Sequence, residues 1–204
     1  MKYKKVLNQD LKLAKLVSLI PTSKINRIEG LGNVREYLIQ CIVSQQLSIK
    51  VAPIIFQRFL DLFGNKFPSN SILLDTSIET LRACGLSNQK ASYILNIARY
   101  FHDNKLKDST LNGLDDEQVI EELTKIKGVG RWTVEMVLMF CMGREDVFST
   151  GDYGIQVAMK DIYNIKKEKK ELEKKMHQIA EKWKPYRSYA CMYLWAYKDL
   201  NVKK

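Results

Sequence analysis

Two glycines, Gly128 and Gly130, stand in the stretch IKGVGRWTVE, directly before a predicted helix. Glycine accepts positive φ and close backbone approach, so the pair predicts a tight turn or a surface that a partner can approach. Free N–H groups at a helix start, together with the helix dipole, favour an anion such as a phosphate. A plain helix–helix turn fits equally well, and the G-x-x-x-x-G-K-[ST] pattern of a nucleotide P-loop is missing.

Asp152, in STGDYG, and Trp132 are the other residues whose types could do chemistry. An Asp before a helix start is a common N-cap, and this pattern alone favours that structural role. A carboxylate in such a place can cap a helix and act in catalysis at once. The face of an indole is the best side-chain partner for a cationic ring, with about 0.5–2 kcal/mol available. Packing of the helix is the alternative role for Trp132.

The composition fits a folded, basic protein. The 204 residues suffice for one domain or for two small lobes that share a cleft. Lys plus Arg is 33 and Asp plus Glu is 23, a formal net charge of +10. This surplus suggests a polyanionic partner, and charge alone leaves nucleic acid and an anionic membrane surface both open. No apolar run approaches the roughly 18 residues of a membrane span, and the N-terminus has no signal-peptide pattern. We therefore expect an intracellular protein.

The cysteines and histidines predict no metal site. The cysteines are spread along the chain without a C-x-x-C pair, at Cys41, Cys84, Cys141 and Cys191. That spacing argues against zinc and against an iron–sulfur cluster, and it favours buried thiols in a reducing compartment. His102 and His177 lie in no ligand pattern.

Helical periodicity runs through almost the whole chain, so the expected fold class is all-α. The expected elements are a helix pair over 34–64 broken at SQQLS, helix–turn–helix units over 77–106 and 114–143, and helices from about Tyr153, over 164–183 and over 186–200. The two helix–turn–helix units form a weak internal repeat. In it Gly85 aligns with Gly128, Ala91 with Val134 and Leu95 with Leu138. Chance similarity of two amphipathic helices is the alternative.

Four motifs in one order resemble the helix–hairpin–helix (HhH-GPD) DNA glycosylase superfamily. LTKIKGVGRWTVEMVLMF resembles its hairpin, with Lys127 where a proline is common. DVFSTGDYGI looks like its loop with the catalytic Asp, and SQQLS resembles its loop that wedges into DNA. KWKPYRSYACMYLW is similar to the C-terminal segment of the AlkA type, the 3-methyladenine DNA glycosylase II group. The resemblance covers residues from about 35 to 200.

The resemblance implies a two-lobed helical fold with the active cleft between the lobes. Residues 1–34 and 145–204 would form one lobe, and residues 35–144 the other, with the hairpin at about 123–140. Larger relatives carry an N-terminal β-domain, which we do not expect here.

The resemblance also implies a monofunctional enzyme that removes alkylated, cationic purines such as 3-methyladenine from duplex DNA by base flipping, in base excision repair. Asp152 would be the catalytic residue. Trp132 stands where bifunctional members carry the lysine that forms a Schiff base. The expected base pocket consists of Trp132, Tyr153, Trp195 and Met136. Met136 falls where some relatives have an aromatic residue.

Further residues match the parts of the family that hold DNA. Gln46 and Leu47 are the expected wedge, with burial as the alternative. Phosphate contacts are expected at Gly128, Gly130, Arg131, Lys127 and Arg187. Hairpin carbonyls can hold Na⁺ or K⁺ in this family, and Thr124, Ile126 and Val129 occupy those positions. No cofactor is expected to be required. We expect a monomer that binds double-stranded DNA and no membrane, in the bacterial nucleoid or the eukaryotic nucleus.

Three other functions remain open. A bifunctional oxidised-purine glycosylase with lyase activity is opposed by Trp132, although another lysine such as Lys125 could substitute. A non-catalytic helix–hairpin–helix DNA-binding module explains the charge and the hairpin but gives no reason for Asp152 among aromatic residues. An iron–sulfur enzyme like endonuclease III is opposed by the cysteine spacing.

Overall fold

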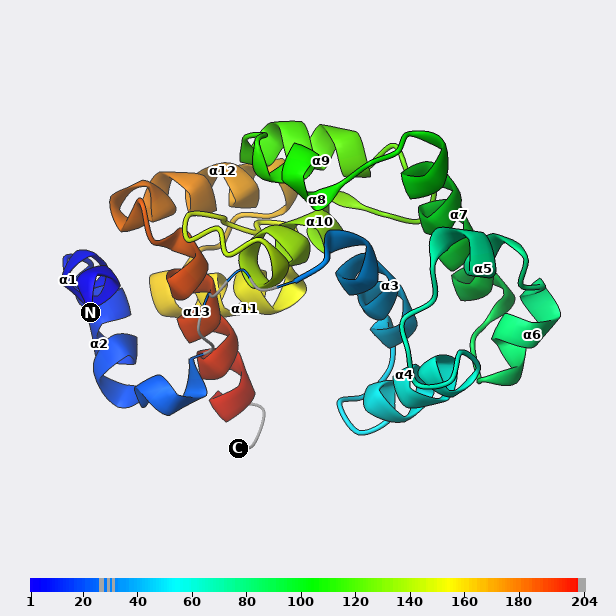
Figure 1. Ribbon diagram of the computed structural model, residues 1–204. Coiled ribbons are helices and arrows are strands. Elements are labelled where there is room, and N and C mark those ends of the chain that lie inside the picture. Colours follow the sequence, from blue (N-terminus) through cyan, green and yellow to red (C-terminus); the bar gives the residue numbers. More distant parts are fainter. Residues whose placement is uncertain (26–27, 29, 31, 202–204) are drawn as a thin grey trace. The chain divides into compact units, whose positions relative to one another are not determined.

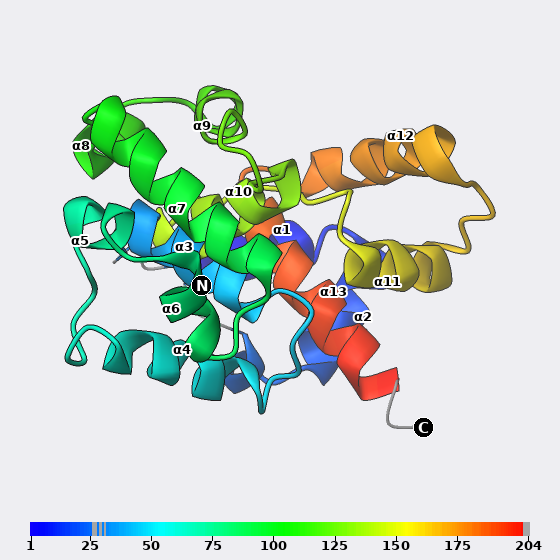
Figure 2. The ribbon, with the colours of Figure 1, turned by 90° about the vertical axis from the view of Figure 1, so that its right-hand side faces the viewer.

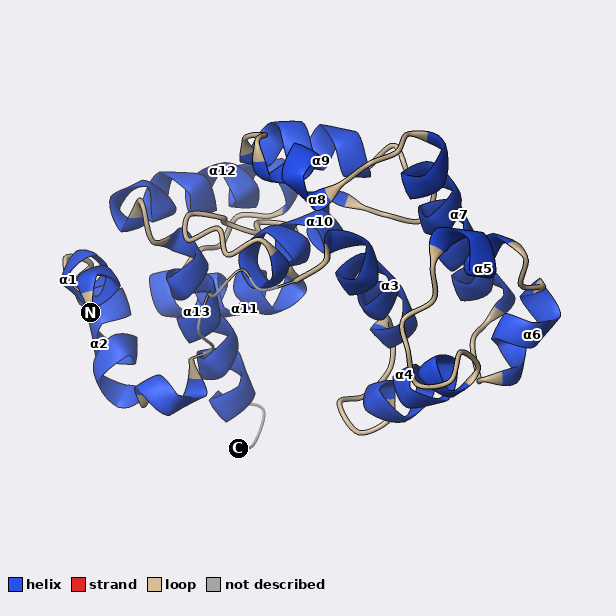
Figure 3. Ribbon diagram, viewed as in Figure 1, coloured by secondary structure: helices blue, strands red, loops and turns tan. Residues whose placement is uncertain are grey.

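The computed structural model describes residues 1–25, 28, 30 and 32–201 (Figure 1). This described part contains helices and loops and no strand (Figure 3), so the all-α prediction is confirmed. None of its helices has the length and apolar character that crossing a bilayer requires. The chain divides into two compact units, Leu31–Val137 and the pair Met1–Gly30 with Leu138–Lys204. We call them the central unit and the terminal unit.

The central unit packs around one long helix, α7. Its helices are α3 (Val34–Ser44), α4 (Ala52–Asp61), α5 (Asn70–Leu74), α6 (Ile78–Ala83), α7 (Asn88–Asp103), α8 (Asp108–Asn112), α9 (Asp116–Leu123) and α10 (Arg131–Met136). Helices α3, α5 and α6 contact α7 (Figure 2). Apolar residues at helical spacing give α7 its buried face, which consists of Ala91, Ile94, Ile97, Ala98 and Phe101. The break expected at SQQLS is present between α3 and α4.

The internal repeat is a repeat of backbone geometry. Helices α6 and α7 are joined at Gly85, and helices α9 and α10 at Gly128. The two glycines have φ of +103° and +105°, a region that residues with a Cβ rarely adopt. The helix that follows is preceded by Ser87 in the first copy and by Gly130 in the second. The two glycine turns therefore share one backbone geometry, whereas Leu95 lies within α7 and its aligned partner Leu138 lies in the π-helical segment Val137–Cys141.

The terminal unit combines both ends of the chain around α13. Its helical elements are α1 (Lys2–Leu7), α2 (Leu11–Leu19), η1 (Thr22–Lys24), α11 (Tyr153–Tyr163), α12 (Lys169–Ala180), η3 (Glu181–Trp183) and α13 (Arg187–Asn201). A π-helical segment, Val137–Cys141, follows α10 directly. Helices α2 and α11 both contact α13, and α1 contacts η3. Helix α11 begins at Tyr153, as the sequence predicted.

A buried carboxylate joins the N-terminal helices to the later part of this unit. Asp10 caps α2 and is 3% exposed. Its Oδ2 accepts the hydroxyl of Tyr163 at 2.7 Å and the indole N–H of Trp183 at 3.1 Å. The ammonium of Lys182 lies 3.1 Å from the same oxygen. Burial alone would raise the pKa of Asp10, but the hydrogen bonds from Tyr163, Lys182 and Trp183 outweigh it and lower that pKa.

Candidate functional site

Asp152 lies at the start of α11 in the terminal unit and is 9% exposed. Its Oδ1 accepts the backbone N–H of Ile155 at 2.9 Å, so the predicted N-cap is confirmed. The same oxygen accepts the indole N–H of Trp195, from α13, at 2.8 Å. A carboxylate so withdrawn from water needs such donors. The second of them is more than a helix cap requires, and it fixes the acid against an aromatic side chain.

Gly154 makes room for this contact. A Cβ at Gly154 would lie 3.1 Å from Oδ1 of Asp152 and 3.2 Å from Cδ1 of Trp195. Both distances are tighter than ordinary van der Waals contact, so any larger residue would press on the pair. Sequence reasoning did not single out Gly154. The signal was available in GDYG, where a glycine takes the second position of a helix that has no need of one.

Two further aromatic rings belong to this part of the terminal unit. Tyr153, next to Asp152, is 75% exposed. Phe140 and Trp195 have ring centroids 6.0 Å apart, and both line a cavity of about 400 Å³ together with Met192. The structure thus joins Asp152 to Trp195 through a hydrogen bond. Tyr153 is their neighbour in sequence, and its place in the base pocket stays a prediction. Phe140 is an aromatic neighbour that the sequence did not reveal.

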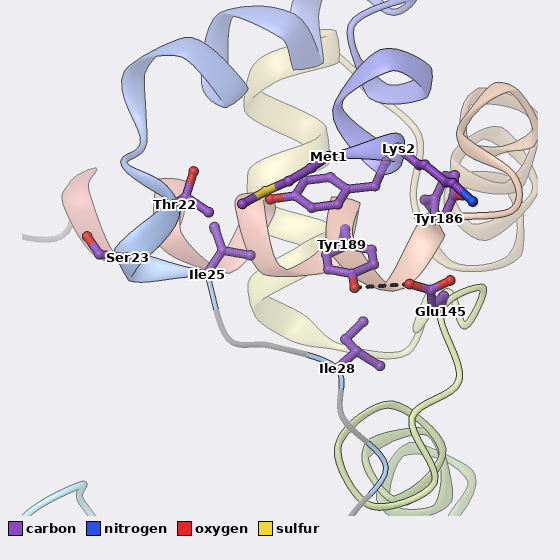
Figure 4. Close-up of a pocket in the computed structure, with 10 residues that line it drawn as sticks. Met1, Lys2, Thr22, Ser23, Ile25, Ile28, Glu145, Tyr186 and Tyr189 are labelled. Atoms are coloured by element: carbon purple, nitrogen blue, oxygen red, sulfur yellow. Dashed lines mark hydrogen bonds between the residues drawn. The ribbon is translucent and has the colours of Figure 1, made fainter.

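A larger cavity of the terminal unit lies elsewhere. It measures about 790 Å³, and Tyr3 is among the residues that line it. Glu145, Tyr186 and Tyr189 also line it (Figure 4). Tyr3 and Tyr189 stack at 4.1 Å, and the hydroxyl of Tyr189 donates to Glu145 at 3.0 Å. Asp152 does not line this cavity. We therefore do not take this cavity as the candidate site, although it is larger, because the buried carboxylate of Asp152 is not part of its lining.

The two glycines of the hairpin have different surroundings in the central unit. Gly128 combines positive φ with contact against the ring of Tyr93, into which a Cβ would project. The fold itself therefore requires glycine at Gly128. Gly130 has φ of −98°, and no atom beyond its own chain neighbours lies within 4 Å of the place that a Cβ would take. The fold leaves this position open.

Comparison of the two copies of the repeat shows that α10 lacks the side-chain cap that α7 has. In the first copy the hydroxyl of Ser87 accepts the N–H of Lys90 at 3.2 Å and so caps α7. Gly130 occupies the corresponding place before α10 and offers no side-chain cap. The N–H groups of a first helical turn have no partner within the helix. An open, uncapped helix start is suited to an anion from outside the chain.

The predicted basic contacts differ in how their charge is used. The guanidinium of Arg131 pairs with Glu117, with one N···O distance of 3.0 Å, and with Glu135 at 3.2 Å. The hydrogen bond that Arg131 donates to the carboxylate of Glu117 is the main reason why the pKa of Arg131 is raised. Arg187, in the terminal unit, donates to Asp146 through Nε at 2.7 Å and Nη2 at 2.9 Å. Lys127 is exposed on the hairpin.

Trp132 and the SQQLS loop meet in the central unit. Trp132, on α10, is 43% exposed. It lines a cavity of about 500 Å³ with Gln46 and Leu47, and also with Cys41 and Ser44. Three of the predicted residues, far apart in sequence, thus share one cavity. Met136 is 8% exposed and does not line this cavity, so the structure does not bring it to Trp132 there.

The loop after α3 has an unusual backbone. Gln46 is exposed and has φ of +57°, a conformation that costs energy for a residue other than glycine. Leu47 is half-buried, and its N–H donates to the carbonyl of Ser44 at 3.2 Å. Strained backbone of this kind is often found at functional sites.

The expected cation ligands lie in the turn after α9. Thr124 is the C-cap residue of α9, and the carbonyl of Ile126 accepts the N–H of Val129 at 3.0 Å. Backbone carbonyl oxygens are the type of ligand atom that a monovalent cation such as Na⁺ or K⁺ binds. The described residues include no group of three or more His, Cys, Asp or Glu side chains that could hold a metal ion.

Comparison with known proteins identifies the family. Residues 39–185 match the model of the HhH-GPD superfamily base excision DNA repair proteins. The DNA-3-methyladenine glycosylase 1 of Schizosaccharomyces pombe is 34% identical over 194 residues, which cover 89% of this chain and 79% of that protein. A Bacillus subtilis relative is 33% identical over 164 residues, and the match covers 78% of this chain and 56% of that protein.

A solved structure agrees. The Schizosaccharomyces pombe 3-methyladenine DNA glycosylase in complex with abasic DNA is 31% identical, with a TM-score of 0.84 over 98% of this chain and 97% of that one. The family match spans the hairpin, Trp132 and Asp152, and the relatives share most of the chain. The protein therefore belongs to the HhH-GPD superfamily of base excision DNA repair proteins.

Proposed function

We propose that the protein is a monofunctional DNA glycosylase that hydrolyses the N-glycosidic bond of alkylated, positively charged purines such as 3-methyladenine in duplex DNA. The observation that carries this proposal is the buried carboxylate of Asp152, held at 2.8 Å by the indole N–H of Trp195. The names of the relatives, DNA-3-methyladenine glycosylases, support the substrate class.

A single carboxylate is enough for this reaction. Most glycosidases use two, because a general acid must protonate the leaving group. A purine alkylated at N3 or N7 already carries positive charge, so it leaves without that proton. Asp152 would then stabilise the oxocarbenium-like sugar and orient or deprotonate the attacking water. The hydrogen bond from Trp195 holds the carboxylate in one orientation for this task.

Trp132 supports hydrolysis without strand cleavage. A lyase needs an amine that attacks the sugar and forms a Schiff base. An indole cannot do so, but its exposed face can stack on an electron-poor base. The product would be an abasic site in an uncut strand.

The target bond lies inside the duplex, so the nucleotide must be flipped out. A side chain that enters the gap stabilises the flipped state. Gln46, exposed at the tip of the loop, and Leu47, beside it, are the candidates for this wedge. Their common cavity with Trp132 supports the assignment, because the wedge and a base-contacting ring should lie near one another.

Binding to the phosphates would rest on the hairpin more than on the arginines. Gly130 leaves open space for a phosphate at the start of α10, and Lys127 is exposed beside it. Arg131 and Arg187 already pair with carboxylates, so each could bind a phosphate only by giving up or sharing its partner. Each neutralised phosphate should steepen the dependence of log K on log salt by about 0.9.

The test is a panel of duplexes that each carry one lesion: 3-methyladenine, 7-methylguanine, hypoxanthine or 8-oxoguanine. We expect release of the alkylated bases, intact strands, and no covalent complex after borohydride treatment. Trapping of the protein on 8-oxoguanine DNA would instead support the bifunctional alternative. Binding without release of any base would support the DNA-binding module.

A further inference from the structure

A lysine from another helix holds the base of the SQQLS loop. Lys90 lies on α7, and its Nζ donates to the carbonyl of Val43 at 2.8 Å and to that of Gln45 at 2.6 Å. Both carbonyls belong to the C-terminal end of α3, where the helix offers no N–H partner. The helix dipole makes this end negative, so an ammonium group is the favoured partner.

The ammonium group of Lys90 is partly buried where it makes these two hydrogen bonds. Lysine side chains usually keep their ammonium in water, but burial lowers the pKa of Lys90. Charged hydrogen bonds to two carbonyls compensate that loss of hydration. Sequence reasoning missed Lys90, because its partners lie 47 and 45 positions away in the chain.

The two carbonyls bound by Lys90 lie directly before the residue with positive φ. Gln45 is the second of the two bound residues, and Gln46 follows at once with φ of +57°. A non-glycine residue stays in this region only when its surroundings hold it there. On the far side of Gln46, the N–H of Leu47 returns to the carbonyl of Ser44. Lys90 thus holds the N-terminal end of a turn whose exposed tip is Gln46.

We propose that Lys90 is a positioning residue that holds the Gln46–Leu47 tip in the conformation that enters the duplex during base flipping. The proposal rests on the proposed function, since it names the residue that prepares the wedge. Lys90 itself does not touch the reacting atoms. By holding the Gln46–Leu47 tip in one conformation beforehand, Lys90 lowers the entropy cost of inserting that tip when the base leaves the stack.

The experiment compares Lys90→Met with Lys90→Arg and with a control, Arg99→Met. Methionine keeps the aliphatic stem but cannot donate, whereas arginine keeps the charge and the donors. Arg99 is exposed on the same helix, nine residues on and so about half a turn round the axis, and its replacement removes the same charge.

Three readouts separate positioning from folding. We expect Lys90→Met to slow single-turnover release of 3-methyladenine about tenfold or more, with thermal unfolding little changed, since small misplacements have such effects. It should also weaken the fluorescence rise of 2-aminopurine placed next to the lesion. Lys90→Arg should recover most of the rate, and Arg99→Met should resemble the wild type.

A fourth readout needs neither enzymatic activity nor DNA. In the free protein, Lys90→Met should speed hydrogen–deuterium exchange of the amides in residues 44–48 and leave that of α7 unchanged. Unchanged exchange together with wild-type base release would overturn the proposal. If the wild type released no base, the proposed function would fail, and the exchange result would still decide whether Lys90 orders the loop. If Lys90→Met failed to fold, the same comparison would be made with Lys90→Gln.

Discussion

At the scale of single residues, the candidate acid is held by contacts that a helix cap alone would not need. Asp152 satisfies the start of α11 through Ile155, yet it also receives the indole N–H of Trp195. Gly154 is the residue that allows the two side chains to approach one another. The orientation of the carboxylate therefore depends on a residue that has no side chain of its own.

This dependence predicts that Gly154→Ala impairs base release. Its Cβ would lie 3.1 Å from Oδ1 of Asp152, so the carboxylate or the indole must shift by a few tenths of an ångström. We expect release of 3-methyladenine to slow about tenfold to a hundredfold, because catalysis is sensitive to small displacements. Single-turnover kinetics on a lesion duplex measure this.

Gly151→Ala is the matched control, since a Cβ there meets nothing within 4 Å. It should keep the wild-type rate. Equal rates for the Gly154→Ala and Gly151→Ala variants would show that the close approach at Gly154 has no bearing on the chemistry.

At the level of secondary structure, the two glycines of the hairpin differ in whether the fold requires them. Gly128 is required by its φ of +105° and by the ring of Tyr93. Gly130 is required by neither, and the repeat has a serine in its place. The fold therefore gives no reason for glycine at Gly130, which agrees with the proposed approach of a phosphate to the backbone there.

We predict opposite outcomes for two substitutions in this hairpin. Gly128→Ala should lower the free energy of unfolding by about 2 kcal/mol or more, because alanine resists positive φ and its Cβ would clash with Tyr93. Gly130→Ala should change stability by only about 0.5 kcal/mol. It should nevertheless weaken binding to undamaged duplex DNA and make the salt dependence shallower by about 0.9.

Thermal unfolding and a salt titration of binding measure the two effects. Tight, wild-type binding by Gly130→Ala would remove the argument for a phosphate at the start of α10.

The sequence predicts the elements well where the information is local. The break at SQQLS, the turns at Gly85 and Gly128 and the start of α11 at Tyr153 each follow from residues that are neighbours in the chain. The partners of the charged groups do not, because Arg187 meets Asp146 across 41 positions and Lys90 meets Val43 across 47. A net charge of +10 likewise does not reveal which cations are already paired. Asp152 could be named from its motif, but the hydrogen bond that orients it could not.

At the scale of the whole molecule, acid stability should depend on Asp10. Its hydrogen bonds with Tyr163 and Trp183 tie the start of the chain to its later helices. Because the pKa of Asp10 is lowered in the folded protein, its contribution is full above the unfolded value of 3.8 and is lost as pH falls through the folded value.

We therefore predict that Asp10→Asn makes the free energy of unfolding less dependent on pH below about pH 4. Asp10→Ala should lower that free energy by about 3 kcal/mol at neutral pH, since it leaves the buried donors unpaired. Urea unfolding at several pH values measures both. A wild-type pH profile for Asp10→Asn would assign the acid sensitivity to other carboxylates.

The proposed catalytic role of Asp152 is tested by the substitution Asp152→Asn. Asparagine is an equally good N-cap, and its carbonyl can still accept from Ile155 and Trp195, so the fold and DNA binding should persist. The measurement is single-turnover release of 3-methyladenine from a duplex with one lesion, alongside binding to the same duplex. We predict release at least about 100-fold slower with binding unchanged, since the charge that stabilises the sugar is gone. Release within about threefold of the wild-type rate, a difference of less than 1 kcal/mol in the barrier, would contradict the account.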